Sequence, residues 1–138
     1  MSEDATKPIR RLNPPGLGPP PGYSQVVEVR AGRIVFIAGQ TALDASGALV
    51  GKDDFAAQAT QVFDNLATAL ASVGGTAADL VKLTVFLRDM NDLGAYRKAR
   101  NRFFESVSPL AAPAVTLVEV SRLYGPDFLI EIEAVAAV

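Results

Sequence analysis

The chain has 138 residues, of which 49% are apolar and 20% are charged, and its formal net charge is −2 at pH 7. This length suits one domain with a full core, and so small a charge argues against a nucleic-acid partner. The chain contains no cysteine and no histidine, which excludes thiol chemistry, imidazole catalysis and the usual zinc ligand sets. No loop has acids at the spacing of a calcium site, so we expect no metal.

Residues 1–22 are rich in Pro and Gly and show no regular periodicity. We interpret them as an extended arm rather than a regular element, either loose or packed on a neighbouring copy. They contain no apolar segment typical of a secretory signal, and no run elsewhere approaches the length of a membrane span. We therefore expect a cytoplasmic protein without a membrane partner, whose single domain covers residues 23–138.

Two β-branched runs, residues 26–30 and 33–38, are separated by Ala31 and Gly32, and this pattern predicts a β-hairpin. The second run is apolar at nearly every position, so both of its faces should be covered. It ends at Gly39, where the missing Cβ allows a backbone or a ligand to approach closely. Extra short strands are expected in residues 41–49.

Apolar residues recur at helical spacing between Asp54 and Val73. This pattern predicts an amphipathic helix with Asp53 or Asp54 as its N-cap, ended by a glycine of the pair Gly74 and Gly75. A strand is expected over residues 80–87, followed by a second helix that begins near residue 91 or 92 and ends near residue 104.

Two further strands are predicted, over residues 113–120 and 129–134. The resulting order β-β-α-β-α-β-β indicates an α+β fold, in which two helices cover one face of a mixed sheet. The strands are too apolar for their other face to meet water. We therefore expect another copy of the chain to cover it.

Several short motifs occur together in a characteristic order: Gly39-Gln40, Gln58 through Asn65-Leu66, residues 81–86, Asn91-Asp92, Pro113-Ala114 and residues 130–134. With them the chain resembles the RidA/YjgF family, the reactive-intermediate deaminases also called endoribonuclease L-PSP, from about residue 16 onward. The resemblance implies a chorismate-mutase-like fold and a homotrimer, with a central barrel and ligand clefts between subunits. It also implies hydrolysis of 2-imino acids to 2-oxo acids and ammonia, with no metal and no organic cofactor.

The resemblance also suggests roles for particular residues. It identifies Glu131 with the glutamate that holds the attacking water, Tyr23 with a cleft tyrosine, and Gly39 with a glycine next to the substrate. Where the family has a serine beside that glycine, this chain has Ala38. Where the family has an asparagine on the second helix, this chain has Arg97.

In the family an arginine pairs with the substrate carboxylate, and this chain has Val115 at the matching position. Loss of such a bidentate contact should cost about 2–5 kcal/mol of binding, or roughly 30- to several-thousand-fold in affinity. Arg97 is a candidate replacement. Thr116 and Leu117 follow on the same strand, and backbone N–H groups of residues 115–117 and of Gly39 are candidate donors to a developing oxyanion.

Each of these residues also has a structural interpretation. Glu131 and Glu133 share one strand face, where an unpaired buried charge would be costly. Glu131 is therefore either a general acid–base with a raised pKa or part of an interface salt bridge. The candidate partners of such a bridge are Arg33, Arg97 and Arg122.

Tyr23 can anchor a loop instead of lining a cleft. Arg97 belongs to the chain's basic cluster of residues 97–102, which is typical of a solvated helix surface near a C-terminal end. Val115 and Thr116 can serve as packing residues; if they line a cleft, it favours a neutral or aromatic ligand.

The leading functional hypothesis is cofactor-independent hydrolysis of a small imine, enamine or related carbonyl compound, in a cleft between subunits, with Glu131 positioning water. The alternative is a non-catalytic trimer that binds a small molecule or a partner protein. The absence of histidine and the acidic balance argue against ribonuclease activity.

Overall fold

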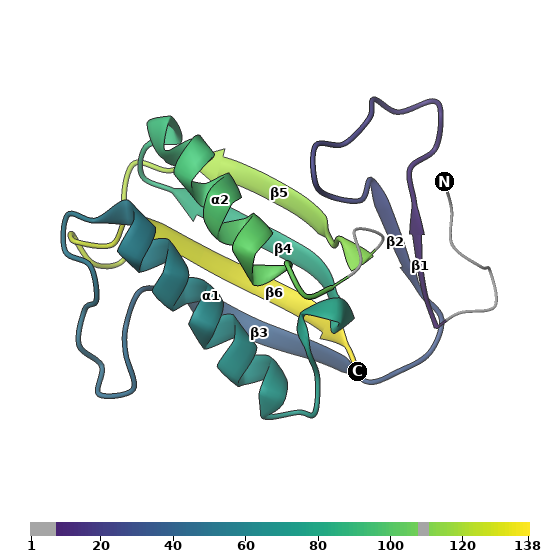
Figure 1. The fold of residues 1–138 in the computed structure, drawn as a ribbon, viewed down its shortest axis with the longest axis horizontal. Helices are drawn as coiled ribbons and strands as arrows, with labels where there is room; N and C mark the ends of the chain where they lie inside the picture. The colour runs from purple at the N-terminus through teal and green to yellow at the C-terminus, as the bar shows by residue number, and fades with distance from the viewer. Residues whose placement is uncertain (1–7, 108–110) are drawn as a thin grey trace.

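The computed structural model describes residues 8–107 and 111–138. Within them lie six strands, two α-helices and two short 3₁₀ turns (Figure 1). The strands are β1 (Ile9–Leu12), β2 (Val26–Val29), β3 (Ile34–Gln40), β4 (Leu80–Leu87), β5 (Ala114–Glu119) and β6 (Ile130–Ala137). The helices are α1 (Phe55–Ala71) and α2 (Leu93–Phe103), and the 3₁₀ turns are η1 (Ala77–Asp79) and η2 (Met90–Asp92).

Four strands form one mixed sheet in the order β3-β6-β4-β5. β6 runs antiparallel to both of its neighbours, whereas β4 and β5 are parallel. Both helices lie side by side across one face of this sheet (Figure 1). The expected α+β fold with two helices on one face is therefore confirmed. Among the described residues no helix is long and apolar enough to cross a membrane.

The predicted hairpin of residues 26–30 with residues 33–38 is wrong. β2 pairs with β1, while β3 pairs with β6, nearly a hundred residues further along the chain. The connection reverses at Gly32, whose φ of 118° places it in the region that favours glycine. Hydrogen bonds between Arg33 and Val138 then hold the start of β3 to the end of β6.

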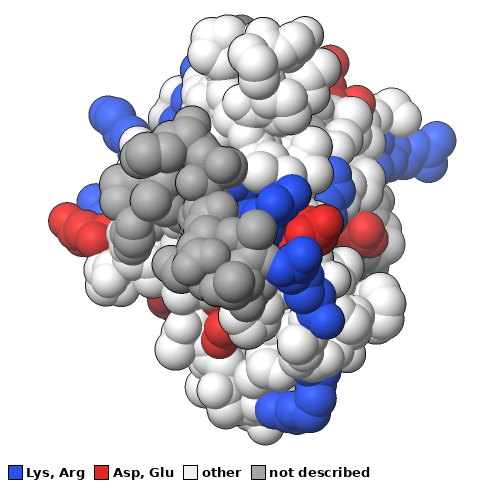
Figure 2. Space-filling model, turned by 90° about the vertical axis from the view of Figure 1, so that its right-hand side faces the viewer, with Lys and Arg blue, Asp and Glu red and all other residues white. Residues whose placement is uncertain are grey.

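The expectation that the first 22 residues form no regular element is wrong for Ile9–Leu12, which is strand β1; residues 1–7 lie outside the described part. The pairing is supported by the Glu28 carboxylate, which lies 3.4 Å from Nε of both Arg10 and Arg30. Residues 12–25, which include the connection from β1 to β2, carry no charge. Figure 2 looks onto this end of the molecule and shows an uncharged lobe above mixed basic and acidic side chains.

Both helices begin and end close to the predicted positions. Asp54 is the N-cap of α1 and accepts a hydrogen bond from the backbone N–H of Ala57. Gly74, with φ of 78°, follows the helix as expected. The predicted short strands of residues 41–49 are reduced to one bridge between Leu43 and Leu49.

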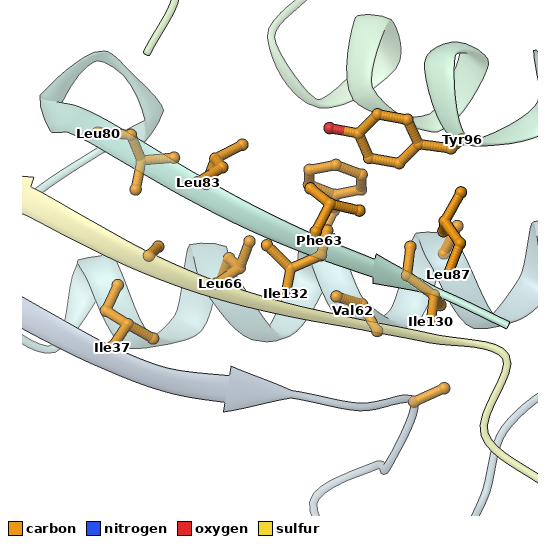
Figure 3. Packing of buried hydrophobic residues seen from close by; sticks show 14 of the residues in the cluster. Ile37, Val62, Phe63, Leu66, Leu80, Leu83, Leu87, Tyr96, Ile130 and Ile132 are labelled. Atoms are coloured by element: carbon orange, nitrogen blue, oxygen red, sulfur yellow. The ribbon is translucent and has the colours of Figure 1, made fainter. Parts of the chain in front are cut away.

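The core lies between the helices and the sheet (Figure 3). Alternate residues of β4 and β6, such as Leu83 and Ile132, are fully buried beneath Phe63 and Leu66 of α1. Tyr96 of α2 completes this layer and stacks on Phe63, with ring centroids 6.2 Å apart. Strand alternation then directs the intervening side chains to the face without helices.

That outer face of the sheet carries exposed apolar side chains. Phe36 is 79% exposed, Ile34 49% and Val118 39%. The expectation that both faces of the 33–38 run are covered is therefore not met within one chain.

Candidate functional site

A pocket of about 240 Å³ opens between α2 and β5, and we call it the helix-side pocket. Four of the sequence-predicted site residues meet there, from three separate parts of the chain: Tyr23, Arg97, Val115 and Leu117. The remaining lining residues are Pro21, Leu93, Tyr96 and Arg100.

Tyr23 reaches this pocket because its neighbour Ser24 is bound to the segment before β5. The Ser24 backbone N–H donates to the carbonyl of Pro113 at 2.9 Å, and its hydroxyl donates to the carbonyl of Ala112 at 2.6 Å. These contacts hold the loop after residue 20 beside the start of β5. The sequence showed the aromatic residue but not the hydrogen bonds that position it.

Arg100 and Tyr96 are pocket residues that the sequence analysis did not single out. The Arg100 guanidinium carbon lies 5.9 Å from the centroid of the Tyr96 ring, within cation–π range. It also lies so close to Gly22 that a Cβ there would be 2.6 Å from an Arg100 nitrogen. Their spacing carried a signal, because residues 96, 97 and 100 share one face of a helix.

The Tyr96 side chain is 1% exposed, and its hydroxyl has no hydrogen-bond partner among the described residues. Figure 3 shows this hydroxyl turned inward over the core. Burial raises the pKa of Tyr96 to about 12, although the nearby charges of Arg100 and Arg97 lower it. Tyr96 is therefore a neutral phenol at physiological pH.

Thr116 does not belong to the helix-side pocket. Successive residues of a strand point to opposite faces, so Thr116 lies on the outer face while Val115 and Leu117 pack toward the core. There the Lys82 ammonium donates to the Thr116 hydroxyl at 2.7 Å. Thr116 as a binding residue therefore stays a prediction, and its side chain lies away from the helix-side pocket.

Glu131 lies on the outer face, beside a bulge in β3. The register of β3 against β6 shifts between Ile37 and Gln40, so Ala38 and Gly39 fall in this irregularity. A methyl group on Gly39 would stand 2.9 Å from the Glu131 carboxyl carbon and would overlap the carboxylate itself. Glycine at position 39 is thus what leaves room for the acid.

Glu131 is half-buried and has no ion pair with any residue the structure describes. The structure therefore shows no bridge to Arg33, Arg97 or Arg122 within one chain, and Arg33 instead donates to the carbonyl of Val73 at 2.9 Å. Burial raises the pKa of Glu131, and the negative charge of Glu133 raises it further. Burial beside a like charge is an arrangement that recurs in carboxylates acting as general acids or bases.

The predicted site residues thus form two groups within one chain. The helix-side pocket lies on the helix-covered side of the sheet, whereas Glu131, Ala38 and Gly39 lie toward the other side. No described pocket is lined by members of both groups.

Beside Gly39 a groove of about 690 Å³ runs between the 39–45 segment and α1. The Tyr124 side chain forms one of its walls, and its hydroxyl is 2.7 Å from the Thr41 hydroxyl. Asn65 of α1 braces the same segment by donating to the carbonyls of Thr41 and Leu43. Gly39 is the only residue of the Glu131 group that lines this groove.

Comparison with known proteins connects these features to a family. A family model described as "Endoribonuclease L-PSP" matches residues 17–138. A RutC family protein of Pyrococcus horikoshii is 38% identical over 136 residues, which cover 99% of this chain and 94% of that protein. A Salmonella typhimurium protein named 2-iminobutanoate/2-iminopropanoate deaminase is 36% identical over 123 residues, covering 89% of this chain and 90% of that protein.

Solved structures of similar proteins point to the same family. The Rid-family protein YyfB of Yersinia pestis, of unknown function, is 37% identical, with a TM-score of 0.86 over 96% of this chain and 100% of that chain. RidA of the Antarctic bacterium Psychrobacter sp. PAMC 21119 is 32% identical, with a TM-score of 0.68 over 84% of this chain and 88% of that chain. This chain therefore belongs to the RidA/YjgF family, also called endoribonuclease L-PSP.

Proposed function

We propose that this protein is a cofactor-independent hydrolase that deaminates a small imine or enamine, or a related reactive carbonyl compound. The observation that carries the proposal is Glu131: a half-buried carboxylate with a raised pKa and no ion pair, beside a glycine that leaves space next to it. A relative with 36% identity that is named as a 2-imino acid deaminase supports the reaction class.

The chemistry needs one water molecule and one proton shuttle. Glu131 accepts a proton from water as the water oxygen bonds to the imine carbon, and it passes that proton to the imine nitrogen, which gives a carbinolamine. Glu131 then takes the hydroxyl proton of the carbinolamine and delivers it to the amino nitrogen as the carbon–nitrogen bond breaks, so that a carbonyl compound and ammonia leave. Backbone N–H groups of residues 115–117 and of Gly39 are the proposed donors to oxygen during these steps.

The two groups of site residues combine if copies of the chain assemble. In the proposed homotrimer, the helix-side pocket of one copy meets Glu131 and Gly39 of its neighbour. The exposed apolar side chains of the outer face favour such an assembly, because large exposed apolar surfaces mark contacts between proteins.

Substrate selection differs from that implied by an arginine at position 115. Val115 offers no charge, while Arg97 and Arg100 line the same pocket from α2. Tyr23 adds aromatic surface, whereas the buried Tyr96 contributes little. We therefore propose substrates that are more apolar than short 2-imino acids, or that present an anionic group to Arg97 and Arg100.

Turnover of 2-imino acids generated in situ by an amino-acid oxidase tests this function. The unaltered protein is compared with Val115→Arg, Glu131→Gln and, as a matched control, Glu105→Gln, whose carboxylate is exposed beyond α2. We expect Glu131→Gln to lower kcat by about 100-fold or more, with Glu105→Gln unchanged. Val115→Arg should raise kcat/KM for short 2-imino acids by about tenfold or more.

The outcomes separate the alternatives. Activity in the unaltered protein that survives Glu131→Gln would sink the proposed role of Glu131. No turnover by the unaltered protein, together with turnover by Val115→Arg, would mean that the site is intact but adapted to another ligand.

A non-catalytic binding trimer is the second candidate, and the observation that favours it is Val115 in place of an arginine. No turnover by any variant, together with retained binding of small molecules, would support the binding trimer. We do not propose ribonuclease activity, since the chain has no histidine and a net charge of −2.

A further inference from the structure

A further pocket, of about 370 Å³, lies at the end of β4 and is distinct from the helix-side pocket and from the groove beside Gly39. Two arginines line it, Arg88 and Arg122, together with Leu123, Tyr124 and Pro126. We call it the Arg88 pocket.

Neither guanidinium is neutralised by the part of the chain that the structure describes. Arg88 is half-buried, and its Nε is shielded from solvent with no hydrogen-bond partner among those residues. Arg122 is exposed and likewise lacks an acidic partner there. A buried, unpaired donor on a charged side chain is costly. The arrangement therefore favours binding of an anion that comes from outside the chain.

Arg88, which lines this pocket, lies near Glu131 on the sheet. Phe86 of β4 is directly opposite Glu131 of β6, and the Arg88 N–H donates to the Leu129 carbonyl at 3.2 Å. The antiparallel register thus continues, and Arg88 follows Phe86 on the outer face. Diagonal neighbours of this kind have Cα atoms about 7–8 Å apart, a span that a ligand of a few carbon atoms can bridge.

Tyr124 connects the two regions. Its side chain lines both the Arg88 pocket and the groove beside Gly39. The ring is held on one side by Phe128, with centroids 4.7 Å apart, and by the hydroxyl contact to Thr41. Tyr124 therefore forms a wall that the Arg88 pocket and the groove share.

We propose that Arg88 and Arg122 bind a small anionic group, a carboxylate or a phosphate, at the edge of the Glu131 region. Two guanidiniums suit such oxygens because they donate paired hydrogen bonds. The assignment deepens the proposed function, on which it rests only for the role of Glu131, by giving the ligand an anionic end on the side away from position 115. The anion site itself is tested by binding alone.

The experiment titrates the unaltered protein with three probes: 2-oxobutanoate, inorganic phosphate and the neutral ketone 2-butanone. Binding is followed by calorimetry or by NMR. The variants are Arg122→Gln, Arg88→Gln, Arg88→Lys and, as a control, Arg102→Gln, which removes an exposed arginine of α2. We expect either glutamine variant of the pocket to weaken binding of the preferred anion by about tenfold or more.

Arg88→Lys should weaken it less, while Arg102→Gln should leave it unchanged, and 2-butanone should bind no differently in any variant. Tighter binding of 2-oxobutanoate would identify a carboxylate ligand, and tighter binding of phosphate a phosphate ligand.

Three results would overturn the proposal: no anion binding to the unaltered protein, equal losses in Arg102→Gln, or a smaller assembly in Arg122→Gln with anion affinity unchanged. The last result would assign the arginines to a contact between copies. Anion binding without imine hydrolysis would keep the pocket and reject the proposed function, so the two fail separately.

Discussion

At the scale of single residues, two glycines make room for charged side chains of the site. Gly39 has no Cβ where the Glu131 carboxylate lies, and Gly22 has none where the Arg100 guanidinium lies. In both places a charged side chain occupies the space of the missing methyl group. The flexible end of the Glu131 side chain can move at little energetic cost, so a change at Gly39 should affect activity more than stability. Gly22 differs, because its φ of 86° is one that larger residues rarely adopt.

Gly39→Ala tests this view. The added methyl group must displace the Glu131 carboxylate, so we expect kcat for the proposed hydrolysis to fall by about tenfold or more. The free energy of unfolding should change by less than about 1 kcal/mol, because only a side-chain end moves. Turnover and urea denaturation are measured side by side, with Gly94→Ala, which meets open space, as the control. A large loss of stability with normal activity would contradict the argument.

The pH profile depends on Glu133 as well as on burial. Burial and the charge of Glu133 both raise the pKa of Glu131, and Glu131 must be ionised to accept a proton from water. Activity should therefore rise with pH through that raised pKa. In Glu133→Gln the second cause is removed, so the acidic limb of the kcat profile should move to lower pH. If the acidic limb of the profile does not move, Glu131 does not take part in the rate-limiting proton transfer.

The same pKa shift links Glu131 to stability. Because the folded-state pKa is raised, the stability that goes with the protonated form is complete below the unfolded pKa and is lost as pH rises through the folded pKa. Glu131→Gln should therefore raise the free energy of unfolding at pH 7 relative to the unaltered protein, and the gain should vanish at pH 4. Chemical denaturation at both pH values measures this difference. A gain of equal size at both would argue against an ionisation effect.

At the scale of elements, α1 fixes the start of β6 through one buried polar side chain. Gln58 is 0% exposed. Its amide nitrogen donates to the carbonyls of Gly51 at 3.1 Å and Asp127 at 2.8 Å, and its oxygen accepts from the N–H of Leu129 at 2.9 Å. This is the segment from which Glu131 projects two residues later.

Gln58→Leu should therefore be severe. It leaves the carbonyl of Asp127 and the N–H of Leu129, both in part-buried hydrogen bonds, without this partner, at a cost of about 1–3 kcal/mol of unfolding free energy. Gln61→Leu is the matched control, since Gln61 makes a single hydrogen bond, at 2.8 Å, to Asn65 in a half-buried position. Urea denaturation compares the two, and similar small losses would refute the anchoring role of Gln58.

Local pattern was sufficient for elements whose signal lies within their own sequence. Asp54 and the apolar stripe behind it predicted α1, and alternation placed Glu131 opposite Ile130 and Ile132. The pairing of β3 was missed because its partner lies near the other end of the described chain, and an adjacent turn is the default expectation. Arg88 was missed because a lone basic residue after a strand has no distinctive pattern until Arg122 lies beside it.

At the scale of the whole molecule, the outer face of the sheet is the feature that one chain leaves unfinished. Phe36, Ile34 and Val118 are exposed there, whereas the helix side is closed over a full core. The family resemblance suggested a trimer, and the exposed side chains give that proposal a physical basis. They also place Glu131 on the face that the proposed assembly would cover.

Phe36→Asp should dissociate the assembly. Each protomer would lose about 1.5–3 kcal/mol of apolar burial, and the introduced charge would have to be desolvated. Sedimentation velocity should show a trimer for the unaltered protein and monomers for the variant. Leu17→Asp alters a side chain that is 50% exposed in the uncharged β1–β2 connection and should leave the trimer intact. A monomeric unaltered protein would overturn the proposal.

The position of β6 between β3 and β4 also has a consequence for biosynthesis. A ribosome releases β3 and β4 long before β6, so both strands must wait with open hydrogen-bonding edges until the segment that joins them emerges. Each of their pairings with β6 then closes a long stretch of chain, which slows folding. The nascent protein should accordingly rely on chaperones until β6 has left the exit tunnel, and truncation before Ile130 should yield an aggregating chain rather than a smaller domain.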